Sequence, residues 1–136
     1  MSAGYSGTPL PRKLGIAAGS TFALVDPPEG ATALLEPLPD GASSVSDAAD
    51  ADVVLVFVTE RAALERKLDG LGRAIFPDRT LWVAWPKRAS KVPTDVTEDV
   101  VRDVALPLGL VDVKVAAVDA TWSSLKLVWR RERRGG

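Results

Sequence analysis

The stretch DVVLVFV, Asp52–Val58, decides the fold class of this chain. It is apolar on both faces and rich in β-branched residues, a pattern typical of a strand that helices cover on each side of a parallel sheet. A second such stretch, TLWVAW, spans Thr80–Trp85. Between the two strands we expect an amphipathic helix, because Leu64, Leu68 and Leu71 fall on one helical face.

The same alternation of strands and helices extends towards the amino terminus. We expect a first strand over Phe22–Asp26, followed by a helix that begins at Pro27 or Pro28 and stops before Pro37. A short second strand is expected around Ser43–Ser46.

The carboxyl half continues the pattern and then ends in a hairpin. We expect Thr59 and Thr97 each to cap the helix that follows it. The last apolar segments, VDVKVAAV and SLKLVWR, are joined by the short DATWS, which predicts two antiparallel strands. The fold class is therefore α/β, a single three-layer Rossmann-like domain with a mostly parallel sheet.

Length and composition set limits on function. The chain has 136 residues, which is one domain over residues 1–136, with an arm at 1–13 that should lack regular structure and a flexible basic tail at 131–136. The net charge of -1 gives no reason to expect nucleic acid or a membrane as a partner. The first residues lack the apolar core of a signal peptide, so we expect a cytoplasmic protein.

The residue types also exclude several chemistries. There is no cysteine and no histidine, which removes thiol nucleophiles, disulfides, zinc sites of the Cys/His kind and a histidine base. Asp47, Asp50 and Asp52 lack the spacing and the glycine of a calcium loop, so we expect no metal site.

The succession LGIAAGSTFALVD, ADVVLVFV, LWVAWPK and a terminal hairpin resembles class I methyltransferases over about residues 14–130. The resemblance implies strand order 2-1-3-4-6-5 with strand 6 antiparallel, in a shortened version that lacks one strand and two helices. In that family a glycine-rich turn after the first strand approaches S-adenosylmethionine. Here LVDPPEG places Pro27 and Pro28 in that turn, and proline has no N–H and blocks close approach. Asp26 matches the acidic residue at the strand end, but we do not expect S-adenosylmethionine to bind, and the cofactor stays unknown.

A second resemblance covers the whole chain. The blocks GYSGTPLPRKLGI, WVAWPKRASKVPTD, VVRDVALPLGLVDVKV and TWSSLKLV are similar to a catalogued group of small bacterial proteins, the domain-of-unknown-function family 3052. That resemblance implies no activity.

A candidate site follows from the expected topology. In an open α/β sheet, ligands bind beyond the carboxyl ends of the strands, where the strand order reverses. The loop after TLWVAW delivers three cations to that edge, which suit a phosphate or a carboxylate. The residues expected to form the site are Asp26, Glu29, Trp85, Lys87, Arg88, Ser90, Lys91, Thr94 and Asp95, together with Tyr5 of the arm and Trp122 of the hairpin loop.

These residues also have simpler interpretations. The cations can be solvated loop residues, the tryptophans can fill the core, and Tyr5 can belong to a strap that packs on the sheet. Our main hypothesis is a noncatalytic or regulatory domain that binds an anionic small molecule or a protein partner. The alternatives are a pared-down methyltransferase that uses S-adenosylmethionine and a purely structural interaction protein.

Overall fold

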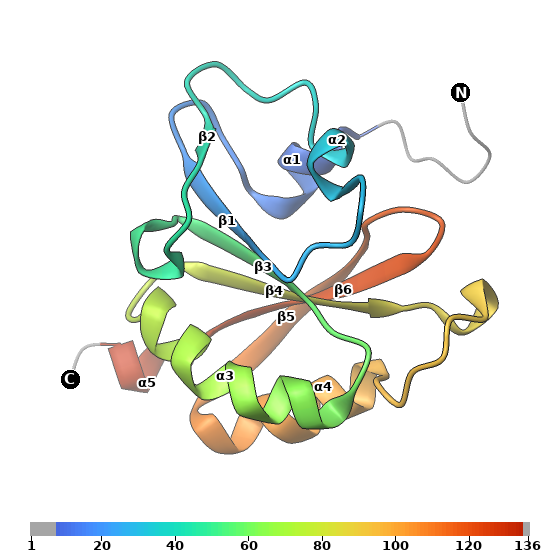
Figure 1. Cartoon of the computed structure of the whole chain (residues 1–136). Coiled ribbons are helices and arrows are strands. Elements are labelled where there is room, and N and C mark those ends of the chain that lie inside the picture. Colours follow the sequence, from blue (N-terminus) through green and yellow to red (C-terminus); the bar gives the residue numbers. More distant parts are fainter. Residues whose placement is uncertain (1–7, 135–136) are drawn as a thin grey trace.

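The computed structural model describes residues 8–134 as a six-stranded sheet between two layers of helices (Figure 1). The strand order β2-β1-β3-β4-β6-β5 confirms the predicted topology. The first four strands pair in parallel, and β6 runs antiparallel to both β4 and β5. The strands are β1 (Thr21–Val25), β2 (Ser43–Ser44), β3 (Val53–Phe57), β4 (Thr80–Pro86), β5 (Leu110–Ala117) and β6 (Trp122–Trp129).

Helices lie on both faces of this sheet. In Figure 1, α1 and α2 lie above the sheet and α3 and α4 lie below it. No helix between residues 8 and 134 has both the length and the apolar character needed to cross a membrane. The helices are α1 (Leu10–Leu14), α2 (Ala31–Leu34), α3 (Arg61–Ile75), α4 (Glu98–Ala105) and α5 (Arg131–Arg134), with 3-10 turns η1 (Ala48–Asp50), η2 (Arg88–Ser90) and η3 (Leu106–Leu108).

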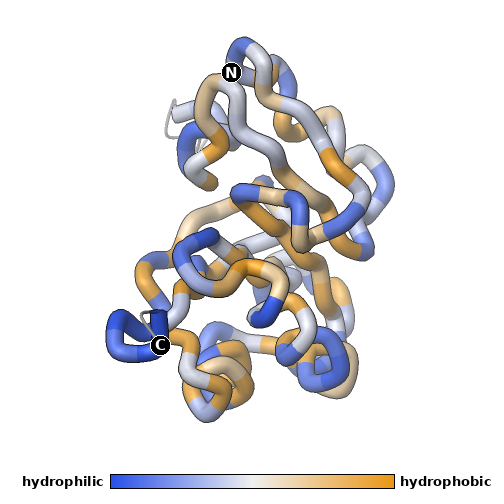
Figure 2. Tube along the Cα trace, turned by 90° about the vertical axis from the view of Figure 1, so that its left-hand side faces the viewer, coloured by the Kyte–Doolittle hydropathy of each residue, from blue (hydrophilic) through white to orange (hydrophobic). Residues whose placement is uncertain are grey.

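The central strand β3 explains why the core has two halves. All five of its residues are buried, as its apolar sequence predicted. Val54 and Val56 pack with Leu64 and Leu68 of α3, whereas its other residues pack towards α1 and α2. Figure 2 shows hydrophobic segments running through the middle of the molecule and strongly hydrophilic segments next to the C-terminal end.

Helix α1 differs from the expectation that residues 1–13 have no regular structure. Pro11 sits in the first turn of α1, where the helix needs no N–H from it, and Gly15 ends the helix with a left-handed φ of 84°. The indole Nε1–H of Trp82 donates a hydrogen bond of 2.9 Å to the carbonyl of Leu14. The prediction was wrong here because it considered only the prolines and glycines of the segment. The hydrogen bond from Trp82 and the buried apolar side of α1 stabilise the helix.

Two other local predictions need correction. Helix α2 is shorter than expected: it begins after Gly30, and the Pro27–Pro28 pair stays in the loop before it. Thr59 does not cap α3, because Glu60 precedes the helix and the cap comes from another loop. Residues 131–134 form the short helix α5 with exposed side chains, and the flexibility expected of the tail at 131–136 stays a prediction.

Candidate functional site

The carboxyl ends of the parallel strands meet at one edge of the sheet. Val25 of β1 is paired in parallel with β3, and β3 is paired in parallel with β4, so all three strands leave the sheet in the same direction. The hairpin joins this edge, because Pro86 at the end of β4 lies opposite Trp122 at the start of β6. The expected arrangement of strand ends is therefore confirmed.

The loop after β4 is held against the hairpin by Lys87. Its backbone N–H donates to the carbonyl of Thr121 at 2.7 Å, and its Nζ donates to the carbonyl of Asp119 at 2.8 Å. Ser90 Oγ then donates to the carbonyl of Lys87 at 2.6 Å, which closes the turn η2. Of the predicted site residues, Lys87 and Ser90 thus have structural contacts that fix the position of this loop.

Arg88 and Lys91 are the cations of this loop that stay available. Both side chains are exposed, and neither forms an ion pair within residues 8–134. Lys91 has a left-handed backbone with φ 62°, a conformation that costs a lysine free energy. Within the same range Asp26, with φ 53°, is the other non-glycine residue of this kind. The two strained residues of the described chain therefore both follow strands at the carboxyl edge.

The second half of the loop contacts the connection between β3 and α3. Thr94 Oγ1 donates to the carbonyl of Thr59 at 2.6 Å. The Asp95 carboxylate accepts a hydrogen bond of 2.7 Å from the backbone N–H of Arg61, the first residue of α3. Thr94 and Asp95, predicted as ligand contacts, thus use polar atoms to hold the start of this helix.

The residues at the exit of β1 make contacts with α3 rather than with the loop after β4. The carboxylate of Asp26 is ion-paired with Lys67 of α3, and Glu29 is exposed. No hydrogen bond or ion pair within the described residues joins Asp26 or Glu29 to the turn η2. With Pro27 and Pro28 in the turn and the Asp26 carboxylate already paired, this exit does not fit S-adenosylmethionine.

The aromatic residues predicted for the site are part of the core. Trp85 is only 7% exposed and packs with the α3 side of the sheet. Trp122 is the first residue of β6 and not a loop residue, and its ring meets Phe57 edge-on with centroids 5.1 Å apart. The hairpin turn is shorter than predicted, so Trp122 belongs to the strand, and its side chain packs against the buried cluster on the α1 side of the sheet. Tyr5 lies outside the described residues.

Two perturbed groups lie on the final hairpin. Arg102 of α4 donates to Asp112 of β5 at 2.8 Å, and this hydrogen bond lowers the pKa of Asp112. Partial burial, with a smaller contribution from the charge of Lys114, lowers the pKa of Lys126. Neither group belongs to the loop after β4.

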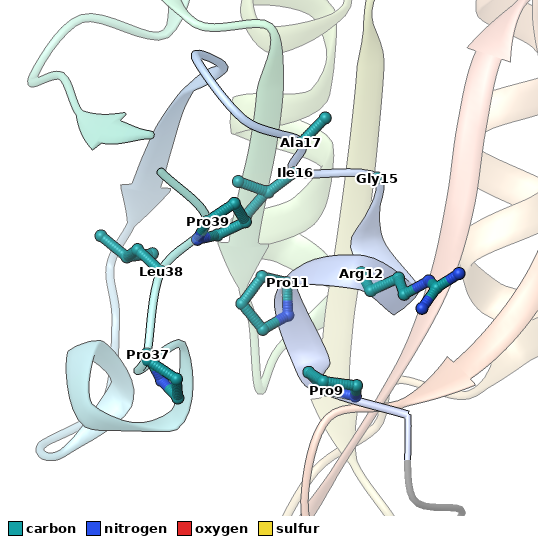
Figure 3. Close-up of a pocket in the computed structure, with 9 residues that line it drawn as sticks. All are labelled: Pro9, Pro11, Arg12, Gly15, Ile16, Ala17, Pro37, Leu38 and Pro39. Atoms are coloured by element: carbon teal, nitrogen blue, oxygen red, sulfur yellow. The ribbon is translucent and has the colours of Figure 1, made fainter. Parts of the chain in front are cut away.

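One cavity was not expected from the sequence. It has a volume of about 450 Å³ and lies between α1 and the segment that follows α2 (Figure 3). None of the predicted site residues lines it. No pattern in the sequence indicates that these two proline-containing segments, far apart in the chain, face each other. The lining residues are Pro9, Pro11, Arg12, Gly15, Ile16, Ala17, Pro37, Leu38 and Pro39.

Comparison with known proteins gives matches only among solved structures. No family model matches the chain, and no curated protein matches it. The pyocyanin biosynthetic protein PhzM aligns with TM-score 0.61 and 16% identity over 89% of this chain, which spans about half, 53%, of that protein.

Two further structures are similar over most of the chain. A SAM dependent methyltransferase from Aquifex aeolicus aligns with TM-score 0.59 and 13% identity, over 85% of each chain. Magnesium protoporphyrin IX methyltransferase from Synechocystis PCC 6803 aligns with TM-score 0.53 and 11% identity, over 89% of this chain and 74% of that chain. At such low identity, similarity in structure shows a shared fold and not a shared activity. The chain therefore has a Rossmann-like fold, similar to that of these methyltransferase structures.

Proposed function

We propose that this chain is a noncatalytic methyltransferase-like domain that binds an anionic small molecule through Arg88 and Lys91 at the carboxyl edge of the sheet. The observation that carries the proposal is the left-handed backbone of Lys91, φ 62°, in a loop where the side chains of Lys87 and Ser90 already have hydrogen-bond partners. Strained non-glycine residues persist where the surrounding structure holds them, and they cluster at functional sites.

The charges of the loop support an anionic ligand. Arg88 and Lys91 are three residues apart on one rigid turn, and no carboxylate within the described residues neutralises them. A guanidinium and an ammonium group on one turn suit a phosphate or a polycarboxylate, which can accept charge-assisted hydrogen bonds from both.

A thermal-shift experiment on the full chain tests this proposal. Pyrophosphate and citrate are expected to raise the melting temperature of the wild type, because a ligand that binds only the folded state stabilises it. The double variant Arg88→Ala/Lys91→Ala should lose this shift. The double variant Arg66→Ala/Arg131→Ala is the matched control, since it removes the same charge from exposed sites on α3 and α5. An equal shift in both double variants would contradict the proposed site.

Similarity to methyltransferase structures favours one second candidate, a methyltransferase that uses S-adenosylmethionine. Calorimetric titration of the full chain with S-adenosylmethionine separates the two candidates. Binding at micromolar Kd would favour the methyltransferase, whereas absence of heat together with a citrate or pyrophosphate shift supports the noncatalytic domain. Absence of any response to phosphates, nucleotides and carboxylates would favour a purely structural interaction protein.

We further propose membership of the small bacterial family 3052, supported by the four sequence blocks quoted above. A cytoplasmic location stays a prediction, and fractionation of the producing cells would test it.

A further inference from the structure

We propose that the cavity between α1 and the Pro37–Pro39 segment binds a small amphipathic carboxylate, with its apolar body inside the cavity and its anionic group outside, at Arg12. This site is separate from the loop that carries Arg88 and Lys91. Its volume, about 450 Å³, lies within the range of small-molecule sites.

The wall of the cavity suits an apolar body. Pro9, Pro11, Pro37 and Pro39 contribute rings and no N–H donors, and Leu38 is 37% exposed (Figure 3). The carbonyls of Pro9, Pro11 and Pro39 already accept hydrogen bonds from backbone N–H groups, so a ligand need not supply donors for them. An apolar group placed there removes hydrocarbon surface from water without leaving these polar groups unpaired.

The wall is also rigid before any ligand binds. Proline fixes φ, and the four rings belong to two segments that the fold holds in place. One segment is α1, anchored to the sheet by the hydrogen bond from Trp82 to Leu14. The other is tied at its far end, where the carbonyl of Asp40 accepts a hydrogen bond of 2.8 Å from the N–H of Gly19. A preformed site loses less conformational entropy on binding than a site that must order itself.

Arg12 gives the site its charge preference. It is the one charged residue of the lining, it is exposed, and its side chain has no ion pair or hydrogen bond within residues 8–134. In Figure 3 its guanidinium extends away from the proline rings and from the Pro37–Pro39 segment. Because this exposed side chain has no partner within the described residues, it can turn towards a carboxylate at the edge of the cavity, and that carboxylate need not be buried among the prolines.

Calorimetry on the full chain tests the proposal with three probes. Hydrocinnamate has both parts of the expected ligand, hydrocinnamyl alcohol has the same apolar body without the charge, and acetate has the charge without the body. We expect a Kd of about 1 mM or tighter for hydrocinnamate, as suits a ligand of this size. The alcohol should bind about threefold more weakly, since an exposed ion pair contributes modestly. Acetate should not compete with hydrocinnamate.

Two variants and their matched controls assign the binding to this cavity. Arg12→Gln should remove the difference between hydrocinnamate and its alcohol, whereas Arg66→Gln on α3 should leave it unchanged. Leu38→Ser should weaken both probes by about fivefold through loss of apolar contact, whereas Val92→Ser, at a similarly exposed residue of another loop, should not. Arg88→Ala/Lys91→Ala should also leave hydrocinnamate binding unchanged, which separates this site from the one proposed above.

Three results would overturn the proposal. The first is absence of heat from the wild type at about 10 mM hydrocinnamate, well above the expected Kd. The second is unchanged binding of both probes in Arg12→Gln and Leu38→Ser. The third is binding seen only after residues 1–7 are deleted, with the fold of that variant checked by circular dichroism, since the occupant of the cavity would then be the chain's own N-terminal segment.

Discussion

The carboxylate of Asp95 and the backbone N–H of Arg61 are joined by a hydrogen bond of 2.7 Å, so the loop after β4 caps the helix that follows β3. A helix leaves its first N–H groups without partners inside the helix, and an acidic side chain at that end is also favoured by the helix dipole. The contact couples two successive strand–helix units at the edge of the sheet where the loop with Arg88 and Lys91 lies.

Replacing Asp95 by alanine should therefore destabilise the protein by about 1 kcal/mol, the usual effect of losing a helix cap. Urea unfolding followed by circular dichroism measures this change. Glu60→Ala is the control, because Glu60 precedes α3 but makes no side-chain cap, and its effect should stay within about 0.5 kcal/mol. Equal effects of the two variants would show that the Asp95 contact does not stabilise α3.

Replacing Lys91 by glycine should stabilise the protein by about 1 kcal/mol, because glycine adopts a left-handed backbone without the cost that a lysine bears. The same variant should weaken the response to pyrophosphate. Arg88→Gly serves as the comparison, since Arg88 lies in a turn with ordinary backbone and should lose stability on the same change. Urea unfolding midpoints of the wild type, Lys91→Gly and Arg88→Gly measure these changes in stability. A lower midpoint for Lys91→Gly than for the wild type would contradict the prediction.

Trp82→Phe should cost about 1–3 kcal/mol, since it leaves the buried carbonyl of Leu14 without its donor. Trp129→Phe deletes the equivalent donor to Gly72, 2.8 Å away, at a half-buried site where water can replace it. Its cost should be smaller. Equal destabilisation of the two variants would show that the loss of the hydrogen bond between Trp82 and Leu14 does not cause the larger effect expected for Trp82→Phe.

The Arg102–Asp112 contact predicts a pH dependence in acid. The hydrogen bond lowers the pKa of Asp112 in the folded protein, so the unfolded chain takes up the proton first as the pH falls. The stabilisation is present above the ordinary carboxyl pKa, about 3.9, and is lost below it. Asp112→Asn should thus flatten the fall in urea midpoint between about pH 6 and about pH 3.

Lys126 predicts that the stability of the protein also depends on pH in the alkaline range. Burial lowers its pKa in the folded state, so between that value and the ordinary lysine pKa, about 10.4, the unfolded chain binds more protons. Stability should then rise with pH in this range. In Lys126→Met the rise should be smaller, as measured by urea unfolding at about pH 7 and about pH 9.5. A steeper rise in the variant would contradict the assigned direction.

The sheet could be predicted because its signals are local. The run Val53–Phe57 is apolar on both faces, and only a central strand between two helical layers satisfies that pattern. The order of strands came from the resemblance to methyltransferases, and the pairing confirms it. Boundaries set by contacts between distant segments were harder: α1 depends on Trp82, and the cap of α3 depends on Asp95, 34 residues further along the chain.

The sequence predicted the edge of the sheet at which the strand ends meet, whereas the contacts of the candidate residues at that edge could not be predicted. A lysine after a strand looks the same in the sequence whether it faces solvent or, like Lys87, a carbonyl of the next hairpin. Its direction depends on how the loop after β4 packs against the hairpin, which no spacing rule contains. The cavity lined by prolines was missed for the same reason, since its two walls meet only in the folded chain.

The outer strands restrict how this protein can associate. One margin of the sheet, β2, is two residues long, and the other, β5, has an irregular register between Asp112 and Val115 that includes Lys114. A two-residue strand offers too few free N–H and C=O groups for another strand to pair with. In β5 the bulge interrupts the row of backbone N–H and C=O groups, and Lys114 adds a charge there. Neither margin therefore readily accepts a strand from another molecule. A continuous sheet shared between copies through β2 or β5 is therefore disfavoured, and side-chain contacts are the more favourable basis for an assembly.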